Sequence, residues 1–114
     1  METENAILAF AALAQSTRLD VFRLLVKHEP SGVAAGEIAA ALAVPQNTMS
    51  SHLAILARAG LVIGARHGRS IVYRAALTHL GGLVEFLLQD CCGGQAGLCQ
   101  PPAPPTKKRA RAAV

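Results

Sequence analysis

The 114-residue sequence is poor in charged residues and in cysteine, and it has no long apolar run. Charged residues make up 16% and hydrophobic residues 52%, which supplies one compact core and argues against global disorder. No apolar run reaches the roughly 18 residues of a membrane span, and Glu2 and Glu4 stand where a secretory signal would be basic. We therefore expect a single cytoplasmic domain that has no membrane partner.

The patterns that support catalysis are also missing. The sequence has no Gly-rich phosphate loop, no evident catalytic triad and no paired carboxylates. Its cysteines, Cys91, Cys92 and Cys99, are odd in number and clustered, which suits a thiol site in a reducing compartment better than a disulfide framework. We predict that the protein is not an enzyme and that it needs no organic cofactor.

The net charge of +4 is modest, and much of the excess comes from a short stretch near the end of the chain, namely Lys107, Lys108, Arg109 and Arg111. Charge alone therefore does not establish a nucleic-acid partner. We place the folded domain at 1–92, and we expect 93–114, a Gly/Cys loop followed by a Pro-rich basic tail, to be largely disordered.

The most informative stretch is 45–60, where Met49, Leu53 and Leu56 fall on one side of a helix. Its free face carries short amides and hydroxyls, where an ordinary solvated face would be rich in Lys and Glu. Such side chains bind base edges or phosphates without burying a charge. We predict that this helix enters a DNA groove and that its contact residues are Gln46, Asn47, Thr48, Ser50 and Ser51. His52 is a further candidate, with a role at the edge of the core as the alternative.

Four other helices are predicted, over 5–14, 16–28, 35–42 and 78–92, with Ser16 and Thr78 as N-caps of the second and the last. The short turn 43–44 joins the third helix to the polar helix, which is a helix-turn-helix arrangement. The first helix is apolar on more than one side, so a partner subunit could cover its second side. The alternative is a terminal helix that packs on one face only.

After Gly60 the apolar period changes to two, and a β-hairpin is predicted from 61–66 and 69–74 with the loop His67–Gly68. The hairpin carries a basic cluster made of Arg66, His67, Arg69 and Arg74. A basic hairpin after a polar helix favours a wing that grips phosphates or the minor groove through Arg66, His67 and Arg69. The alternative is a small sheet with solvated arginines.

These residues together resemble the ArsR/SmtB family of metal-responsive bacterial repressors, above all in 42–53, 59–62, 68–69 and 72–74. The resemblance implies a mainly α fold with a small β-hairpin, a dimeric winged helix-turn-helix. It also implies operator binding without ligand, release by a metal or metalloid, and a homodimer interface built from the first and last helices. The interface residues that we expect are Ile7, Leu8, Phe10, Leu80, Leu83, Val84 and Leu87.

The cysteine cluster resembles that of arsenic repressors whose thiols lie at the end of the last helix, and the helix over 35–42 contains no thiol. Trivalent arsenic and antimony form pyramidal complexes with three thiolates, which Cys91, Cys92 and Cys99 would supply, whereas a closed zinc site takes four ligands. We predict arsenite as the inducer, with antimonite and methylarsenite as related ligands. Binding would draw the loop 93–98 onto the end of the last helix.

Other uses of the cysteines stay open. Zinc, cadmium or lead would need a further donor such as His79, and oxidation could pair Cys99 with either neighbouring cysteine. The thiols could also simply pack or remain free. A thiol enzyme or a metalloid carrier is a third class, but reactive thiols favour a helix N-terminus and these follow the end of a predicted helix.

Overall fold

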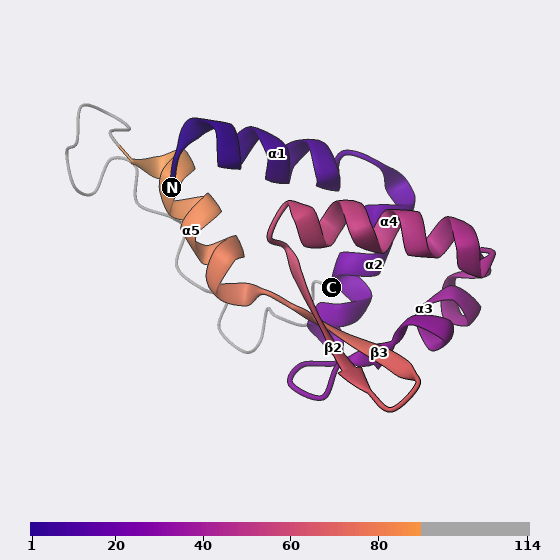
Figure 1. The fold of residues 1–114 in the computed structure, drawn as a ribbon. Coiled ribbons are helices and arrows are strands. Elements are labelled where there is room, and N and C mark those ends of the chain that lie inside the picture. Colours follow the sequence, from indigo (N-terminus) through magenta and orange to yellow (C-terminus); the bar gives the residue numbers. More distant parts are fainter. Residues whose placement is uncertain (90–114) are drawn as a thin grey trace, which may run out of the picture.

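The structure is a computed structural model that describes residues 1–89. Within these residues five α-helices pack together, and a small three-stranded antiparallel sheet lies at one side of them (Figure 1). The helices are α1 (Thr3–Leu13), α2 (Ser16–Lys27), α3 (Ala35–Leu42), α4 (Gln46–Arg58) and α5 (Leu77–Leu88). The strands are β1 (Val33–Ala34), β2 (Val62–His67) and β3 (Ser70–Ala75). The predicted winged helix-turn-helix, mainly α with a β-hairpin, is confirmed.

The core forms around α4, whose apolar side is fully covered by the rest of the chain. Met49, Leu53 and Leu56 are each at most 1% exposed, as the helical spacing predicted. They share the core cluster with Leu25 of α2 and Ile38 of α3. Because α1, α2, α3 and β2 all contact α4, the orientation of its outer face is set from several sides.

The turn between α3 and α4 is short and tight. Ala43 ends α3 in the left-handed conformation, with φ of 55°, and the N–H of Val44 donates to the carbonyl oxygen of Ala39 at 3.0 Å. The left-handed conformation at the end of a helix reverses the chain direction there. Pro45, predicted to open the next helix, is instead its N-cap, and its extended backbone leads directly into Gln46.

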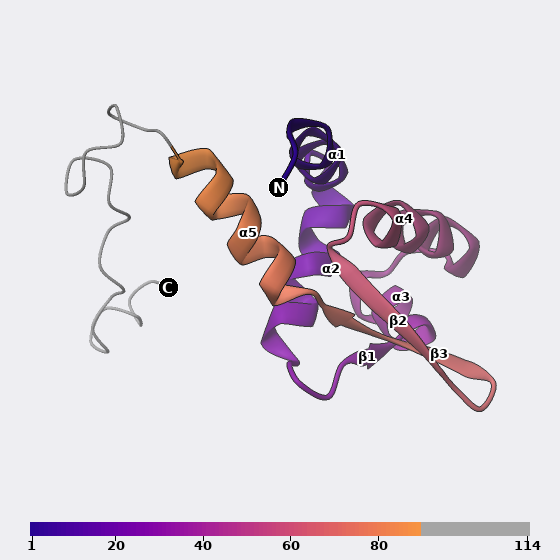
Figure 2. The same cartoon turned by 60° about the vertical axis from the view of Figure 1, so that its left-hand side comes forward.

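The hairpin extends away from the helices (Figure 2). The predicted loop His67–Gly68 is wrong by one residue, because His67 pairs with Ser70 and the loop is Gly68–Arg69. Gly68 has a φ of 64°, so the left-handed conformation falls on the first of the two loop residues. The sequence analysis also missed β1, a two-residue strand that pairs with β3 through Val33↔Tyr73 and Ala34↔Val72.

Two predicted helix caps are wrong. Gln15, not Ser16, is the N-cap of α2, because its longer amide reaches the backbone N–H of Arg18 at 2.8 Å. α5 begins at Leu77 after Ala76, so Thr78 lies inside the helix and does not cap it. The helix ends at Leu88 and so does not continue to residue 92; Cys91, Cys92 and Cys99 lie outside the described residues.

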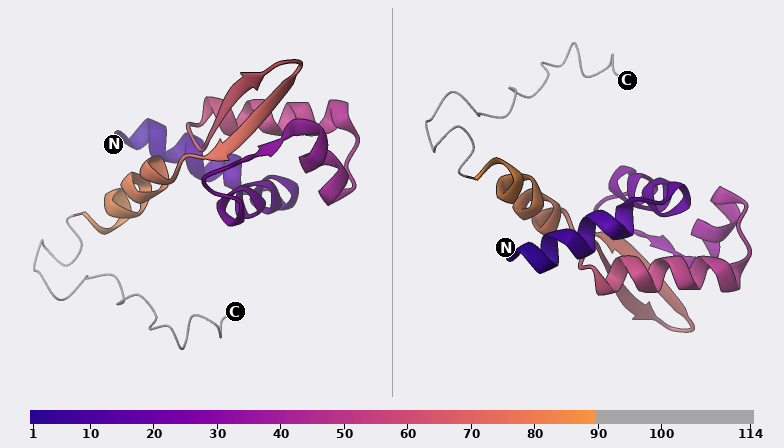
Figure 3. Two further views of the ribbon diagram at one scale, coloured as in Figure 1. Left: turned by 90° about the horizontal axis from the view of Figure 1, so that it is seen from below. Right: turned by 90° about the horizontal axis from the view of Figure 1, so that it is seen from above.

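The residues that flank the hairpin on either side are hydrogen-bonded to each other at its base. The N–H of Ala76, which leads into α5, donates to the carbonyl oxygen of Leu61, which follows α4, at 2.8 Å. Seen from above and below, α5 and the hairpin leave this point in different directions (Figure 3). None of the helices in 1–89 is long and apolar enough to cross a bilayer.

Candidate nucleic-acid interface

The outer face of α4 presents the side chains that the sequence analysis selected. All five are exposed: Gln46, Asn47, Thr48, Ser50 and Ser51. Two of them take part in local hydrogen bonds, since Asn47 Oδ1 accepts from the N–H of Thr48 at 2.9 Å and Ser51 Oγ donates to the Asn47 carbonyl at 3.5 Å. The amide nitrogen of Asn47 and the lone pairs of Ser51 remain available to a ligand.

Gln46 extends this face toward α3. A Cβ placed on Gly36 would lie 3.2 Å from Gln46 Nε2, so the amide rests over the start of α3, where only glycine leaves room without displacement. The uncharged donors and acceptors therefore continue from α4 onto the neighbouring helix. A surface of this composition suits base edges and phosphates.

His52 occupies a different position on α4. It is half-buried, and its Nδ1 lies 3.3 Å from Arg18 Nη1 of α2. Arg18 also donates from Nε to the carbonyl oxygen of Ala12 at 2.6 Å. His52 therefore contacts the body of the protein, the alternative that the sequence analysis had left open. Sequence reasoning missed Arg18, because its partner on α4 is 34 positions away.

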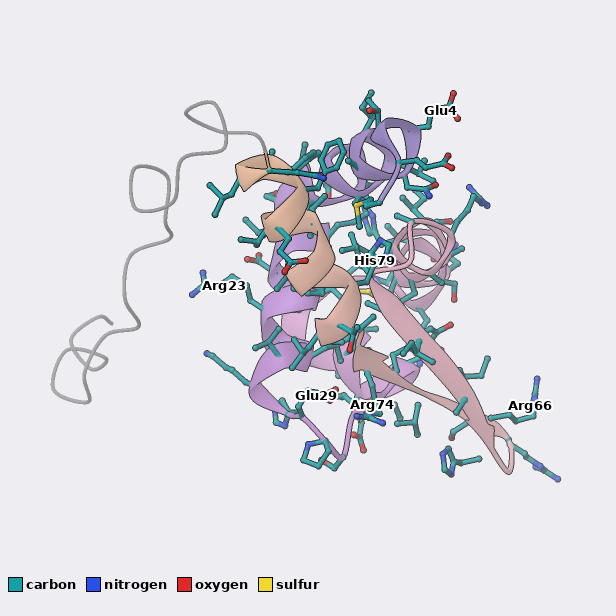
Figure 4. All side chains as sticks on the ribbon, turned by 90° about the vertical axis from the view of Figure 1, so that its left-hand side faces the viewer. Glu4, Arg23, Glu29, Arg66, Arg74 and His79 are labelled. Carbon is teal, nitrogen blue, oxygen red and sulfur yellow. The ribbon has the colours of Figure 1, made fainter. Side chains whose placement is uncertain are left out.

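The basic residues of the hairpin fall into two groups. Arg66, His67 and Arg69 are exposed around the loop, and Arg66 points outward near the tip (Figure 4). Arg74 lies at the base, where Nη2 donates to Glu29 Oε1 at 2.8 Å. Arg74, counted in the basic cluster but not among the predicted phosphate contacts, is paired with a carboxylate. The residues at the tip remain as predicted phosphate contacts.

Glu29 is a second residue that the sequence analysis missed. Its Oε2 accepts from the backbone N–H of Ala75 at 3.1 Å, so one carboxylate holds both the side chain and the backbone at the end of β3. The hydrogen bond from Arg74 and the charge of its guanidinium hold the pKa of this carboxyl below its usual value. The pair joins the loop after α2 to the base of the hairpin.

A separate apolar surface lies on α1 and α5. Ile7, Leu8 and Phe10 of α1 are 61%, 44% and 38% exposed, while the buried residues of that helix are alanines. Val84 and Leu87 of α5 are also exposed. The remaining predicted interface residues differ: Leu80 is half-buried, and Leu83, at 2% exposed, is already part of the core of one chain and offers almost no surface to a partner.

His79, named as a further donor for a divalent metal, lies on α5 beside the turn after α4. Its ring packs against the turn after α4, so that a Cβ on Gly60 would lie 3.0 Å from Nε2, and this nitrogen is buried without a hydrogen-bond partner. Across residues 1–89, no three His, Cys, Asp or Glu side chains gather closely enough to hold a metal ion. The predicted thiol site at Cys91, Cys92 and Cys99 lies beyond this part of the chain.

Comparison with known proteins gives consistent results. A helix-turn-helix domain family matches residues 13–64. The transcriptional activator HlyU of Vibrio cholerae is 30% identical, over 77% of this chain and 79% of its own. An ArsR-like transcriptional regulator from Rhodococcus is 30% identical with a TM-score of 0.67, covering 74% of this chain and 76% of that one. The chain belongs to the ArsR/SmtB family.

The same fold occurs in the homodimeric winged helix-turn-helix DNA-binding domain of Mb0332 from Mycobacterium bovis. That domain has a TM-score of 0.62 and 29% identity, and the match covers 76% of this chain and 81% of that one. As a member of the ArsR/SmtB family, this protein is a DNA-binding transcriptional regulator and not an enzyme. The exposed polar face of α4 and the basic hairpin are the surfaces that such a regulator needs.

Proposed function

We propose that the protein is a homodimeric repressor that binds operator DNA without ligand and releases it when trivalent arsenic binds Cys91, Cys92 and Cys99. The observation that carries the DNA-binding part is the outer face of α4, whose five selected side chains are all exposed and uncharged. A hairpin with a basic tip follows the same helix in the chain. The helix reads bases in the major groove, and Arg66, His67 and Arg69 contact phosphates beside it.

The exposed apolar face of α1 and α5 supports a homodimer. Ile7, Leu8, Phe10, Val84 and Leu87 would each lose unfavourable contact with water if a second copy covered them. The Mb0332 domain, which shares this fold, is homodimeric. A two-fold dimer presents two copies of α4, which suits an operator with half-sites about 34–36 Å apart.

The arsenic-binding part rests on the chemistry of the cysteines. Three thiolates complete the coordination of As(III) or Sb(III), and two suffice for methylarsenite. Cys91 comes three positions after Leu88, where α5 ends. A ligand held there is close in sequence to a helix of the proposed dimer face. A difference of about 1–3 kcal/mol in ligand affinity between the two dimer arrangements is enough for a switch.

The test is fluorescence anisotropy with a labelled promoter fragment that contains the operator, titrated with reduced protein. We expect arsenite to release the DNA, antimonite and methylarsenite to act similarly, and Cys91→Ser/Cys92→Ser/Cys99→Ser to bind DNA but ignore arsenite. Tight binding that no arsenical affects would contradict the inducer. Release by zinc, cadmium, lead or oxidant instead would favour a divalent-metal or redox sensor.

Because the HlyU relative is an activator, the direction of regulation needs its own measurement. Transcription from the same promoter in a purified system should fall when the protein is added and should recover with arsenite. A rise in transcript on adding the protein would show an activator. Absence of specific binding to any promoter fragment would contradict the proposed operator contacts.

A further inference from the structure

We infer that Arg18 is a positioning residue for operator binding, because it holds the recognition helix α4 at a fixed angle to α1 through His52. The inference rests on the proposed function, a homodimer in which the exposed face of α1 helps to join two copies. It assigns His52 a role in the spacing of the two recognition helices and not in reading a base.

Arg18 connects three helices through separate hydrogen bonds. Its Nε donates to the carbonyl oxygen of Ala12 at 2.6 Å, in the last turn of α1. Its backbone N–H donates to Gln15 Oε1 at 2.8 Å, which closes the start of α2. Its Nη1 lies 3.3 Å from His52 Nδ1 on α4.

The contact with His52 has a defined direction. A guanidinium offers only donors, so in a hydrogen bond across this contact Nδ1 of His52 is the acceptor. His52 stands between exposed Ser51 and buried Leu53, at the border between the outer face and the core. A bond at this border resists rotation of α4 about its own axis, because rotation would carry Nδ1 away from the guanidinium.

The rest of the packing between α1 and its neighbours is apolar. The fully buried residues of α1 are Ala6, Ala9 and Ala12, and Leu13 packs half-buried against the same core. Apolar contact is non-directional, whereas a hydrogen bond fixes both distance and angle. Arg18 therefore supplies a directional link between the helix proposed to meet the partner and the helix proposed to meet DNA.

The consequence appears only when both half-sites are bound. A small rotation of α4 leaves a single copy able to bind one half-site, but it misplaces two rigidly joined copies relative to half-sites about 34–36 Å apart. Loss of the Arg18–His52 bond should therefore weaken binding to a complete operator and spare binding to one half-site. A direct base contact by His52 would weaken both.

The experiment compares His52→Leu, which removes the acceptor, with His52→Asn, whose Oδ1 can take the place of Nδ1. Both leave Arg18 bound to Ala12, so the ends of α1 and α2 keep their hydrogen bonds. Affinity is measured by anisotropy at fixed salt on a complete operator and on a fragment with one half-site. Circular dichroism and solution mass establish that each variant folds and dimerises like the wild type.

We expect His52→Leu to weaken complete-operator binding about tenfold, with half-site binding changed less than about twofold, and His52→Asn to recover most of the loss. Inserting a base pair between the half-sites should reduce the affinity of His52→Leu less than that of the wild type, because the spacing of the two α4 helices is no longer fixed in the variant. Equal weakening on both fragments, or none on either, would overturn the inference. If the wild type itself bound one half-site as tightly as two, the proposed dimeric operator binding would fail instead, and the inference with it.

Discussion

The helices α1 and α4 distribute their side chains in opposite ways. α4 buries its large residues, Met49, Leu53 and Leu56, and exposes small polar ones. α1 buries alanines and exposes Ile7, Leu8 and Phe10. Both helices pack against the same hydrophobic core. The difference in which side chains they expose therefore does not arise because one helix lies outside the core.

The contrast shows what each helix stabilises. The large residues of α4 are fully used within one chain, where burying a side chain of that size contributes about 1.5–3 kcal/mol. On α1, Ile7, Leu8 and Phe10 are only partly buried within one chain, and their exposed area remains available to a partner. One helix therefore builds the domain and the other is suited to assembly, a distinction that mutations can test.

The largest effect is expected for Leu53→Ala. Leu53 is 1% exposed, and its truncation leaves a cavity, which should lower the free energy of unfolding by about 2–5 kcal/mol. Leu8→Ala makes the same chemical change on the exposed side of α1. Urea unfolding at several protein concentrations separates the two, because the Leu53→Ala loss should persist on dilution and the Leu8→Ala loss should shrink. If both variants lost the same free energy of unfolding at every protein concentration, the proposed difference between α1 and α4 would be wrong.

The next effect concerns assembly. Ile7→Glu places a charge on the proposed dimer face, and burying it without a partner should weaken self-association by at least about tenfold. Sedimentation equilibrium should show a monomer with an unchanged helical spectrum. Ile63→Glu is the matched control, since Ile63 is also exposed but lies on the hairpin. A dimer that survives Ile7→Glu would place the interface elsewhere.

The outer face of α4 and the hairpin tip should differ in their response to salt. Arg66→Gln removes a phosphate contact, so the slope of log affinity against log salt concentration should become about 0.9 less steep. Ser51→Ala removes an uncharged contact and should weaken binding by about 0.5–1.5 kcal/mol with the same slope. Anisotropy titrations across a salt series measure both. An unchanged slope in Arg66→Gln would place that side chain away from phosphate.

The smallest effect is expected for Glu29→Gln and depends on pH. The pKa of Glu29 is lowered in the folded chain, so its contribution to stability is present above the unfolded carboxyl pKa and is lost as pH falls through the folded value. Near neutral pH the melting temperature of the variant should be slightly below that of the wild type. This difference in melting temperature should disappear at acidic pH. Glu85→Gln, on the exposed side of α5, is the control. A difference in melting temperature that did not change with pH would exclude the ion pair with Arg74 as its cause.

Much of this architecture was predictable, because local patterns control it. The helical spacing of Met49, Leu53 and Leu56 identified the buried side of α4, and the exposed residues opposite followed directly. The range of α3 was also predicted correctly. The helical spacing of apolar residues predicts these elements, and that spacing is visible within a few turns of sequence.

The missed features depend on contacts distant in sequence. β1 is two residues long and exists only because β3 pairs with it, so it has no period of its own. The ion pair of Arg74 with Glu29, 45 positions away, was not predicted, because no local pattern links the two residues. Periodicity alone did not distinguish the exposed side of α1 from a core face; Ile7, Leu8 and Phe10 were assigned to a dimer interface only through the family resemblance, and they are exposed in one chain. A local sequence pattern identifies apolar residues. It does not show whether the same chain or a second copy covers them.

The hydrogen bond between Ala76 and Leu61 makes the hairpin a separable module. Since the chain leaves α4 and enters α5 at the same point, residues 62–75 form a closed excursion whose ends stay fixed. Adding paired residues at the tip would extend its reach by about 3.3 Å per residue on each strand without moving either helix. A change in the length of the hairpin would thus leave α4 and α5 in the same relation to each other.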